Sequence, residues 1–301
     1  MPDGILIIDK PPGMTSHDVV DEVRRLVGMR KVGHAGTLDP MATGVLVLCL
    51  GQATKVVKYL MDSDKVYEAH IRLGVTTDTH DAQGKIVSTS EVDITESEVR
   101  EALSSFVGQI QQVPPLYSAL KYHGTPLYKL ARRGIKVELK PRSVQIYEIE
   151  LLDWAPPCLT IKVVCSAGTY IRALARDLGE RLGCGAHLAH LIRLASGRFT
   201  LREAVSLEEL TRAFERGNWR KLLRPLDDAL VDLPAMVVNE EVEKRIRQGQ
   251  QVEGEGPPGL CRAYSTDGRL VAILKYDQRT GLWQPKRVFQ TSHHPSQVAV
   301  Q

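Results

Sequence analysis

Residues 33–44 read Gly33-His34-Ala35-Gly36-Thr37-Leu38-Asp39-Pro40-Met41-Ala42-Thr43-Gly44, a stretch with three glycines, one proline and one acid. Glycine lets the backbone approach a ligand closely because no Cβ intervenes. Pro40 has a fixed φ and disfavours a helical conformation at Asp39, so the acid is predicted to lie extended in a stiff loop. The apolar run Val45 to Leu50 predicts a buried strand behind this loop. Taken alone, the cluster is equally typical of a structural turn.

The composition is that of a soluble protein with room for two domains. The chain has 301 residues, of which 43% are hydrophobic, and its net charge of +3 neither demonstrates nor opposes nucleic-acid binding. Five cysteines form no C-x-x-C pair, which favours a reducing compartment. No apolar run approaches the roughly 20 residues of a membrane helix, and the N-terminus lacks the basic region of a signal peptide. We therefore expect a cytoplasmic protein.

Hydrophobic periodicity predicts an alternation of strands and helices in the first three quarters of the chain. The predicted strands are Gly4–Ile8, Val45–Leu50, Lys65–Leu73, Gln145–Trp154 and Leu159–Cys165. The first predicted helix is capped by Thr15 or Ser16 and ends at Gly28. The others are Gly51–Met61, Thr95–Gly108, Gly168–Leu182, His187–Leu194 and Leu207–Arg216.

The last quarter of the chain has a different pattern of secondary-structure signals. A short polar helix is predicted at Glu240–Gln248, and residues 250–284 alternate short strands with glycine-containing turns. This pattern indicates a small β-barrel of about 60 residues, a size that can fold alone. We therefore divide the chain into domains at 1–232 and 233–290, and we expect the polar tail 291–301 to be disordered.

Residues 121–142 form a basic stretch with two interleaved tyrosines, Tyr122 and Tyr128. Seven positive residues stand against Glu138 alone. A solvated surface would explain this charge, but the combination favours a surface that follows nucleic-acid phosphates. The positive residues are Lys121, Lys129, Arg132, Arg133, Lys136, Lys140 and Arg142.

Several common kinds of site are not supported. The chain has no P-loop, no dinucleotide-binding glycine fingerprint and no nucleophile elbow. Cys184, His187 and His190 recur every third residue, and on a helix this spacing does not gather three ligands around one point. We expect no metal site.

Asp39 is the candidate nucleophile or base, and Arg172 is its candidate partner. Arg172 lies in the first turn of a predicted helix, where the helix dipole disfavours a cation, so it is a candidate to pair with a carboxylate. Such a pair would keep Asp39 ionised by lowering its pKa. Tyr67 lies on the apolar face of its strand, as either a core residue or a ring that stacks on a nucleobase.

Taken together, these stretches resemble the bacterial tRNA pseudouridine synthase B family. The resemblance covers residues 4 to about 228, and the C-terminal segment is similar, more loosely, to the family's RNA-binding PUA domain. The stretches that carry it are Asp9–Ser16, Gly33–Pro40, Lys65–Tyr67, Gly74–Asp81, Pro114–Lys121, Cys165–Arg172 and Gly183–Leu191.

The resemblance implies an α+β pseudouridine synthase fold, with a mixed, largely antiparallel central sheet flanked by helices and a small C-terminal β-barrel. It implies a monomeric, stand-alone enzyme that flips the T-loop uridine of tRNA, at position 55, and isomerises it to pseudouridine. It implies no cofactor, no metal and no obligatory protein partner. The basic stretch becomes a thumb-like RNA-binding insertion at about residues 121–145.

The resemblance also assigns roles to residues. Asp39 either attacks the flipped nucleotide or removes a ribose proton, Arg172 orients Asp39, and Tyr67 stacks on the base. The residues expected to contact the substrate are His34, Lys10, Asp81, Tyr170, Leu191, Lys121, Arg132 and Arg142. Two alternatives stay open: a relative that works inside a guide-RNA particle, and a non-catalytic RNA-binding or tRNA-folding protein.

Overall fold

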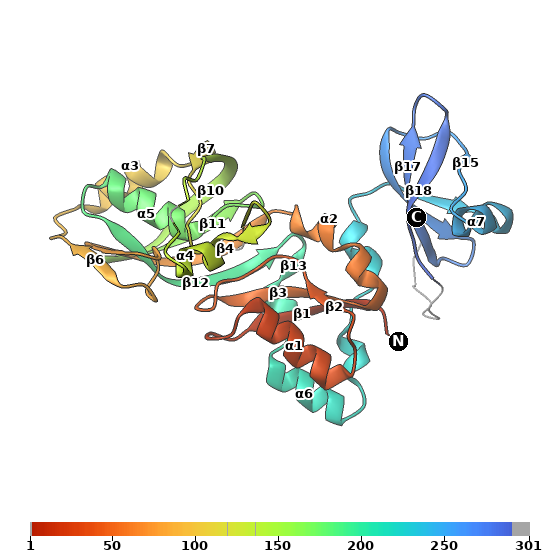
Figure 1. Ribbon diagram of the computed structural model, residues 1–301, viewed down its shortest axis with the longest axis horizontal. Helices are drawn as coiled ribbons and strands as arrows, with labels where there is room; N and C mark the ends of the chain where they lie inside the picture. The colour runs from red at the N-terminus through yellow and green to blue at the C-terminus, as the bar shows by residue number, and fades with distance from the viewer. Residues whose placement is uncertain (1, 119, 136, 291–301) are drawn as a thin grey trace.

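The computed structural model describes residues 2–118, 120–135 and 137–290 (Figure 1). The predicted disorder of the tail 291–301 falls outside these residues. None of the helices in the described ranges is long and apolar enough to cross a membrane.

A nine-stranded mixed sheet forms the body of the protein. Its order is β1-β3-β12-β4-β11-β10-β7, with β2 paired to β3 and β13 paired to β12. The β3–β12 pair is parallel, whereas β12–β4, β4–β11 and β11–β10 are antiparallel, which confirms the predicted mixed sheet. The strands are β1 Gly4–Lys10, β2 Val32–His34, β3 Thr43–Leu50, β4 Lys65–Leu73, β7 Gly108–Gln112, β10 Arg142–Ala155, β11 Cys158–Cys165, β12 Ala186–Ser196 and β13 Phe199–Thr200.

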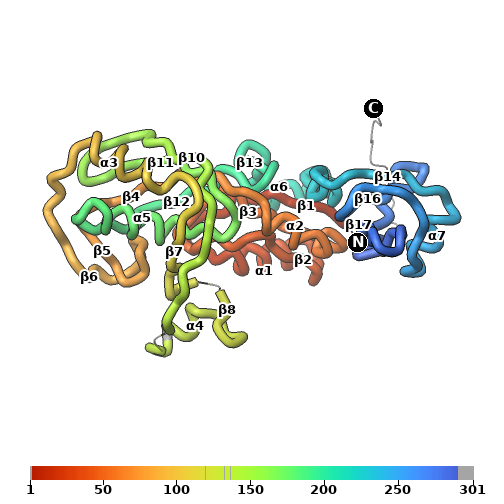
Figure 2. Tube along the Cα trace, turned by 90° about the horizontal axis from the view of Figure 1, so that it is seen from above, coloured from red at the N-terminus to blue at the C-terminus, as the bar shows by residue number. Residues whose placement is uncertain are grey.

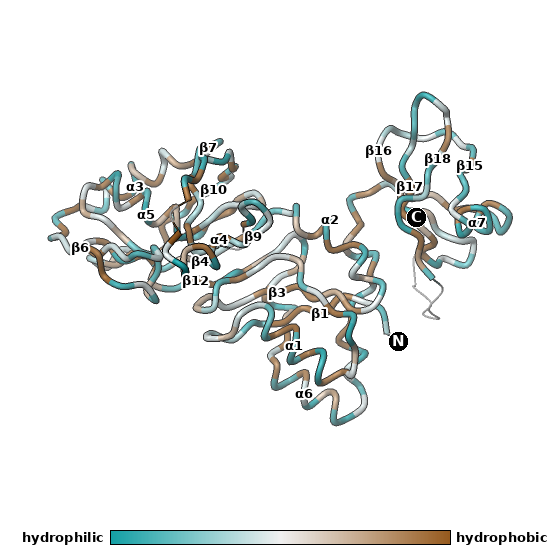
Figure 3. The backbone as a smooth tube through the Cα atoms, viewed as in Figure 1, coloured by the Kyte–Doolittle hydropathy of each residue, from teal (hydrophilic) through white to brown (hydrophobic). Residues whose placement is uncertain are grey.

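The helices cover the two halves of this sheet separately. In one half, α1 and α6 pack on β1 and β3, and in the other α3 and α5 pack on β4 and β11 (Figure 1). Hydrophobic residues follow the strands of both halves (Figure 3). Helix α1 begins with a capping box between Thr15 and Asp18 and ends at Gly28 with a φ of 66°. The helices named here are α1 Ser16–Val27, α3 Glu96–Ser104, α5 Ile171–Arg181 and α6 Leu207–Glu215.

Two predicted helices differ from the structure. The helix predicted at His187–Leu194 is wrong, because this segment lies within strand β12 at the centre of the sheet. The pairing of β12 with β4 is irregular after Leu188 and again after Arg193, and such bulges break the twofold alternation that identifies a strand. The helix predicted at Gly51–Met61 is divided into a 3₁₀ turn, η1 (Gly51–Lys55), and α2 (Val57–Met61).

The basic insertion stands away from the body of the protein. It leaves the sheet after β7 and returns at β10, and Figure 2 shows β8 and α4 projecting beyond the ends of these two strands. Within it, a two-residue hairpin, β8 (Lys121–Tyr122) and β9 (Thr125–Pro126), precedes α4 (Leu127–Arg132). A second hairpin, β5 (Val75–Thr77) and β6 (Ile86–Thr89), follows β4.

The C-terminal segment forms a separate half-barrel sheet with its own core. Its strand order is β14-β16-β17-β18-β15, and α7 (Glu240–Arg247) packs against it. It contacts the body where Phe289 packs against Val56 and Leu230, and where Lys55 Nζ donates to Val288 O at 2.6 Å. The strands are β14 Ala235–Val238, β15 Val252–Glu253, β16 Gly259–Ser265, β17 Leu270–Asp277 and β18 Leu282–Val288. The 3₁₀ turn η4 (Leu226–Leu230) precedes β14.

Candidate active site

A pocket of about 320 Å³ lies at the junction of the two halves of the sheet. The loop between β2 and β3 forms one wall, β4 and β12 form its floor, and the start of α5 forms the opposite wall. The side chains that carry its chemistry are those of Asp39, Lys65, Tyr67, Tyr170, Arg172, Leu191 and Arg193.

The loop that carries Asp39 is tied to the start of α1 by Ser16. The Ser16 hydroxyl donates to Leu38 O at 3.1 Å and accepts from Leu38 N at 2.8 Å. Ser16 is buried, so water does not compete for these two bonds. The residue just before the acid is therefore fixed at both backbone groups.

Lys10 supports the same loop from within the protein. Its Nζ donates to the carbonyl oxygens of Pro11 at 2.8 Å, Pro40 at 3.2 Å and Ala42 at 2.8 Å. The residue is fully buried, and burial lowers the pKa of its ammonium to about 8. The expected contact between Lys10 and RNA is therefore not retained, because the ammonium is already bonded to carbonyls and has no exposed surface.

Arg172 and Asp39 form the central ion pair of the site. Arg172 Nε lies 2.9 Å from Asp39 Oδ2, and Nη2 donates to Oδ1 at 3.0 Å. The arginine is 4% exposed, whereas the carboxylate is 32% exposed. The structure thus brings together the two residues that the sequence analysis paired, with part of the carboxylate open to the pocket.

The surroundings of Arg172 fix its orientation. Nη2 also donates to Tyr117 O at 2.8 Å, Nη1 donates to Thr79 O at 3.2 Å, and Nη1 lies 3.4 Å from Asp81 Oδ2. Asp81 is 4% exposed and does not line the pocket. It therefore lies behind the arginine, and the expected direct contact between Asp81 and substrate is not supported.

Burial and pairing act in opposite directions on Asp39. Burial raises the pKa of the Asp39 carboxyl, the Arg172 guanidinium opposes that rise, and Asp81 adds to it. Pairing with Arg172 lowers the pKa of this carboxyl as expected, but the cost of desolvating the carboxylate is the larger effect, so the net shift is upward.

Tyr67 and Leu191 form the floor of the pocket. Both belong to adjacent central strands, and their side chains are 8% and 5% exposed. Burial raises the pKa of the Tyr67 hydroxyl, so it is protonated at neutral pH. An aromatic ring and an aliphatic side chain beside a carboxylate are suited to hold a flat base.

Tyr170 is fixed in place by its backbone. It precedes α5, and the buried side chain of Gln112 donates to Tyr170 O at 3.0 Å and accepts from Tyr170 N at 2.7 Å. These two bonds connect β7, at the base of the insertion, with the helix that carries Arg172. The sequence analysis did not identify Gln112, because a lone glutamine in a polar stretch gives no signal.

The remaining predicted residues lie outside the pocket. His34 is half-buried in β2, and burial lowers its pKa, which favours the neutral imidazole. Lys121 and Arg142 are exposed where the insertion leaves and rejoins the body. The side chain of Arg132 is not among those that the structure describes. His34, Lys121 and Arg142 do not line the pocket.

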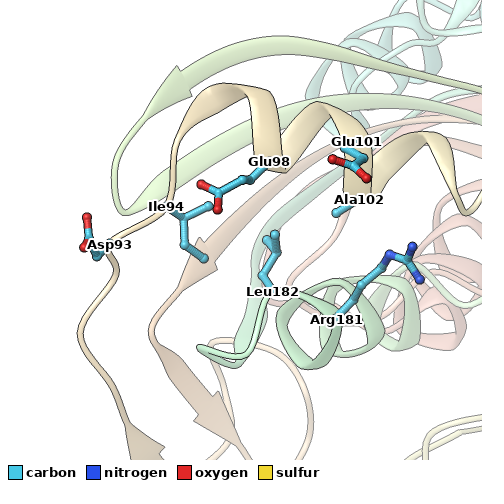
Figure 4. Close-up of a pocket in the computed structure, with 7 residues that line it drawn as sticks. All are labelled: Asp93, Ile94, Glu98, Glu101, Ala102, Arg181 and Leu182. Atoms are coloured by element: carbon cyan, nitrogen blue, oxygen red, sulfur yellow. The ribbon is translucent and has the colours of Figure 1, made fainter.

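A second hollow, between α3 and the end of α5, is less suited to RNA (Figure 4). Asp93, Glu98 and Glu101 line it with a single cation, Arg181. This excess of negative charge repels phosphate. Among the described residues, no group of three or more His, Cys, Asp or Glu side chains is arranged to hold a metal ion.

Comparison with known proteins identifies the family of the chain. Residues 24–171 match the N-terminal domain of the TruB family pseudouridylate synthases, and residues 172–231 match the tRNA pseudouridylate synthase B C-terminal domain. The chain is 50% identical over 289 residues to tRNA pseudouridine synthase B of Dechloromonas aromatica (strain RCB), covering 96% of both chains. It is 52% identical over 284 residues to the protein of that name from Syntrophus aciditrophicus (strain SB), covering 91% of both.

Two solved structures share the fold. One is a Cbf5-Nop10-Gar1 complex, with a TM-score of 0.75, 28% identity and coverage of 95% of this chain and 85% of the other. The second is an H/ACA RNP bound to a substrate RNA that contains 2′-deoxyuridine, with a TM-score of 0.74, 26% identity and coverage of 96% and 85%. The fold is thus that of the pseudouridine synthases, and the chain belongs to the TruB family of pseudouridylate synthases and is an enzyme of this isomerase class.

Proposed function

We propose that this protein is a stand-alone tRNA pseudouridine synthase that isomerises the T-loop uridine at position 55. The observation that carries the proposal is the Asp39–Arg172 pair, with separations of 2.9 and 3.0 Å, whose carboxylate faces a pocket floored by Tyr67. The relatives named tRNA pseudouridine synthase B support tRNA as the substrate.

The proposed reaction exchanges one glycosidic bond for another. The C1′–N1 bond breaks, the freed uracil turns, C5 bonds to C1′, the C5 proton is lost and N1 takes up a proton. Asp39 starts the reaction either by bonding to the nucleotide or by removing a ribose proton, and Arg172 keeps the carboxylate oriented. Since the target uridine is stacked in folded tRNA, it enters the pocket flipped out, with its base against Tyr67 and Leu191.

We further propose how the tRNA is held. The half-barrel sheet at residues 233–290 serves as a PUA-type RNA-binding domain beside the catalytic domain at 1–232. The insertion acts as a thumb on the T stem-loop, with Lys121 and Arg142 exposed at its base to meet phosphates. His34 contacts the RNA at the entrance, and Tyr170 shapes the pocket. The enzyme acts as a cytoplasmic monomer without a cofactor.

The likeness to H/ACA structures keeps a second candidate function in view. One of those structures is a Cbf5-Nop10-Gar1 complex and the other is an RNP bound to a substrate RNA, so a synthase that works inside a guide-RNA particle is the alternative. The exposed basic insertion, which extends from the sheet after β7, favours an enzyme that binds its substrate RNA without other subunits. Activity of the purified chain on tRNA, with no other protein or guide RNA, separates the two functions.

The experiment measures tritium released from tRNA labelled at C5 of uridine, followed by mapping of the modified position. The wild type is compared with Asp39→Asn and with a matched control, Asp153→Asn, whose carboxylate is exposed on β10. We expect release at position 55 from the wild type and the control, and none from Asp39→Asn. Release by Asp39→Asn at the wild-type rate would remove Asp39 from the chemistry, and binding without release by the wild type would favour a guided or binding-only role.

A further inference from the structure

Arg193 is a buried cation in the pocket, and the roles proposed above do not include it. It lies on β12, lines the pocket and is 1% exposed. Its guanidinium donates to three backbone carbonyls: Nε to Val45 O at 2.7 Å, Nη2 to Gly36 O at 3.1 Å and Nη1 to Thr37 O at 3.4 Å. No acid of the described residues is paired with it. A buried charge without a counter-ion costs folding free energy, so an apolar side chain would fill this space at lower cost.

The three carbonyls lie on both sides of the catalytic aspartate. Gly36 and Thr37 precede Asp39 in the loop, and Val45 follows it at the start of β3. One planar guanidinium therefore joins both ends of the segment that presents the carboxylate. The close approach is confirmed at Gly44, where a Cβ would lie 2.3 Å from Arg193 O.

The same side chain reaches the floor of the pocket. Arg193 is the direct cross-strand neighbour of Tyr67 on β4, and both side chains line the pocket, where the guanidinium acts electrostatically on the Tyr67 hydroxyl. It is thus bonded to the loop that carries Asp39 and lies beside the residue expected to stack on the base. Lysine could not make these contacts together, because a guanidinium offers five N–H groups in a fixed plane and an ammonium offers three from one point.

We propose that Arg193 is a positioning residue that sets the distance between Asp39 and Tyr67 and so aligns the carboxylate with the nucleotide stacked on the ring. The proposal rests on the proposed roles of Asp39 and Tyr67. Arg172 orients the carboxylate itself, whereas Arg193 orients the loop backbone against the floor. A misplacement of about 1 Å at a reacting centre can lower a rate about 10²-fold, so a loosened loop reduces the rate more than it reduces binding.

The test compares Arg193→Lys with Arg24→Lys, a matched change at the end of α1, outside the pocket. Arg24 also donates to a backbone carbonyl, Val32 O, at 2.7 Å. For both variants we would measure thermal unfolding, the dissociation constant for tRNA, and the single-turnover rate of tritium release with enzyme in excess. Arg193→Gln, which keeps N–H donors without the charge, is assayed if the lysine variant does not fold.

We expect Arg193→Lys to bind tRNA within about threefold of the wild type and to release tritium about 10²-fold more slowly, with Arg24→Lys near the wild-type rate. In a Tyr67→Phe background the Arg193→Lys change should still slow release, because the loop contacts remain to be lost. Equal rates for the two lysine variants, or a loss of rate that follows a loss of tRNA binding, would overturn the proposal. So would failure of both Arg193 variants to fold while Arg24→Lys folds. An inactive wild type, or an active Asp39→Asn, would instead refute the proposed function.

Discussion

Replacing Arg172 with methionine tests how the central ion pair works. The change keeps most of the side-chain volume but removes the guanidinium that holds Asp39 at 2.9 and 3.0 Å and that satisfies two backbone carbonyls. Breaking a buried ion pair by removing one partner typically costs about 3–5 kcal/mol. Because the Asp39 side chain is 32% exposed and water can reach it, we expect a loss of unfolding free energy at the lower end of this range, about 3 kcal/mol.

The change also shifts the pH dependence in a defined direction. Burial raises the pKa of Asp39 and Arg172 opposes the rise, so removing the arginine leaves the pKa of this carboxyl higher still. If the ionised carboxylate is the active form, activity is lost as the pH falls through that pKa. The acid limb of the single-turnover rate therefore moves to higher pH in Arg172→Met, in addition to a fall in the maximum rate.

Urea unfolding and single-turnover tritium release between pH 5 and 9 measure these effects. Arg176→Met is the control, because Arg176 lies one turn further along α5 and pairs with Asp177 outside the pocket. We expect this pair to contribute less than about 1 kcal/mol and the pH profile to stay unchanged. An Arg172→Met profile whose acid limb coincides with that of the wild type would refute the reasoning that Arg172 acts through Asp39.

Three further changes probe the loop and the RNA surface. Ser16→Ala removes two buried bonds and should cost about 1–3 kcal/mol, with a lower rate and unchanged tRNA affinity in a filter-binding assay. Gly44→Ala places a Cβ 2.3 Å from Arg193 O at a φ of 95° and should prevent a stable fold, whereas Gly13→Ala, at a φ of 84° with open space, should cost about 1 kcal/mol by thermal unfolding. Arg142→Gln should reduce the salt slope of tRNA binding by about one, with the rate at saturating enzyme unchanged.

The parts of the site that are encoded by neighbouring residues could be predicted from the sequence. The glycines and Pro40 around Asp39, the buried strand after the loop and the cation at the start of α5 are all visible within a few residues. The resemblance then related these stretches to one another. The ion pair of Asp39 and Arg172, separated by 133 positions, is the long-range contact obtained in this way.

What could not be predicted depends on register and burial. Leu188 and Leu191 are three positions apart, a spacing typical of a helix, and both are buried in the same core because a bulge in β12 lies between them. The segment was therefore predicted to be helical, and Arg193 was not recognised as a charge in a central strand. From the sequence, Lys10 is expected to be an exposed cation beside a proline turn. Only the folded structure shows that its ammonium is bonded to three carbonyls. Gln112 contacts a backbone 58 positions away, which no local pattern encodes.

The charges around the pocket are consistent with the proposed reaction. Asp39 is the one acid among the described residues that line it, against the cations Lys65, Arg172 and Arg193. Burial lowers the pKa of Lys65 to about 8, so its ammonium is still mainly charged at neutral pH. In the proposed reaction, a uracil that leaves C1′ through N1 takes the bonding electrons and becomes negatively charged, and fixed positive charge stabilises such a leaving group. Arg193 holds the loop through its carbonyls, and together with Lys65 and Arg172 it gives the pocket the sign of charge that favours this cleavage.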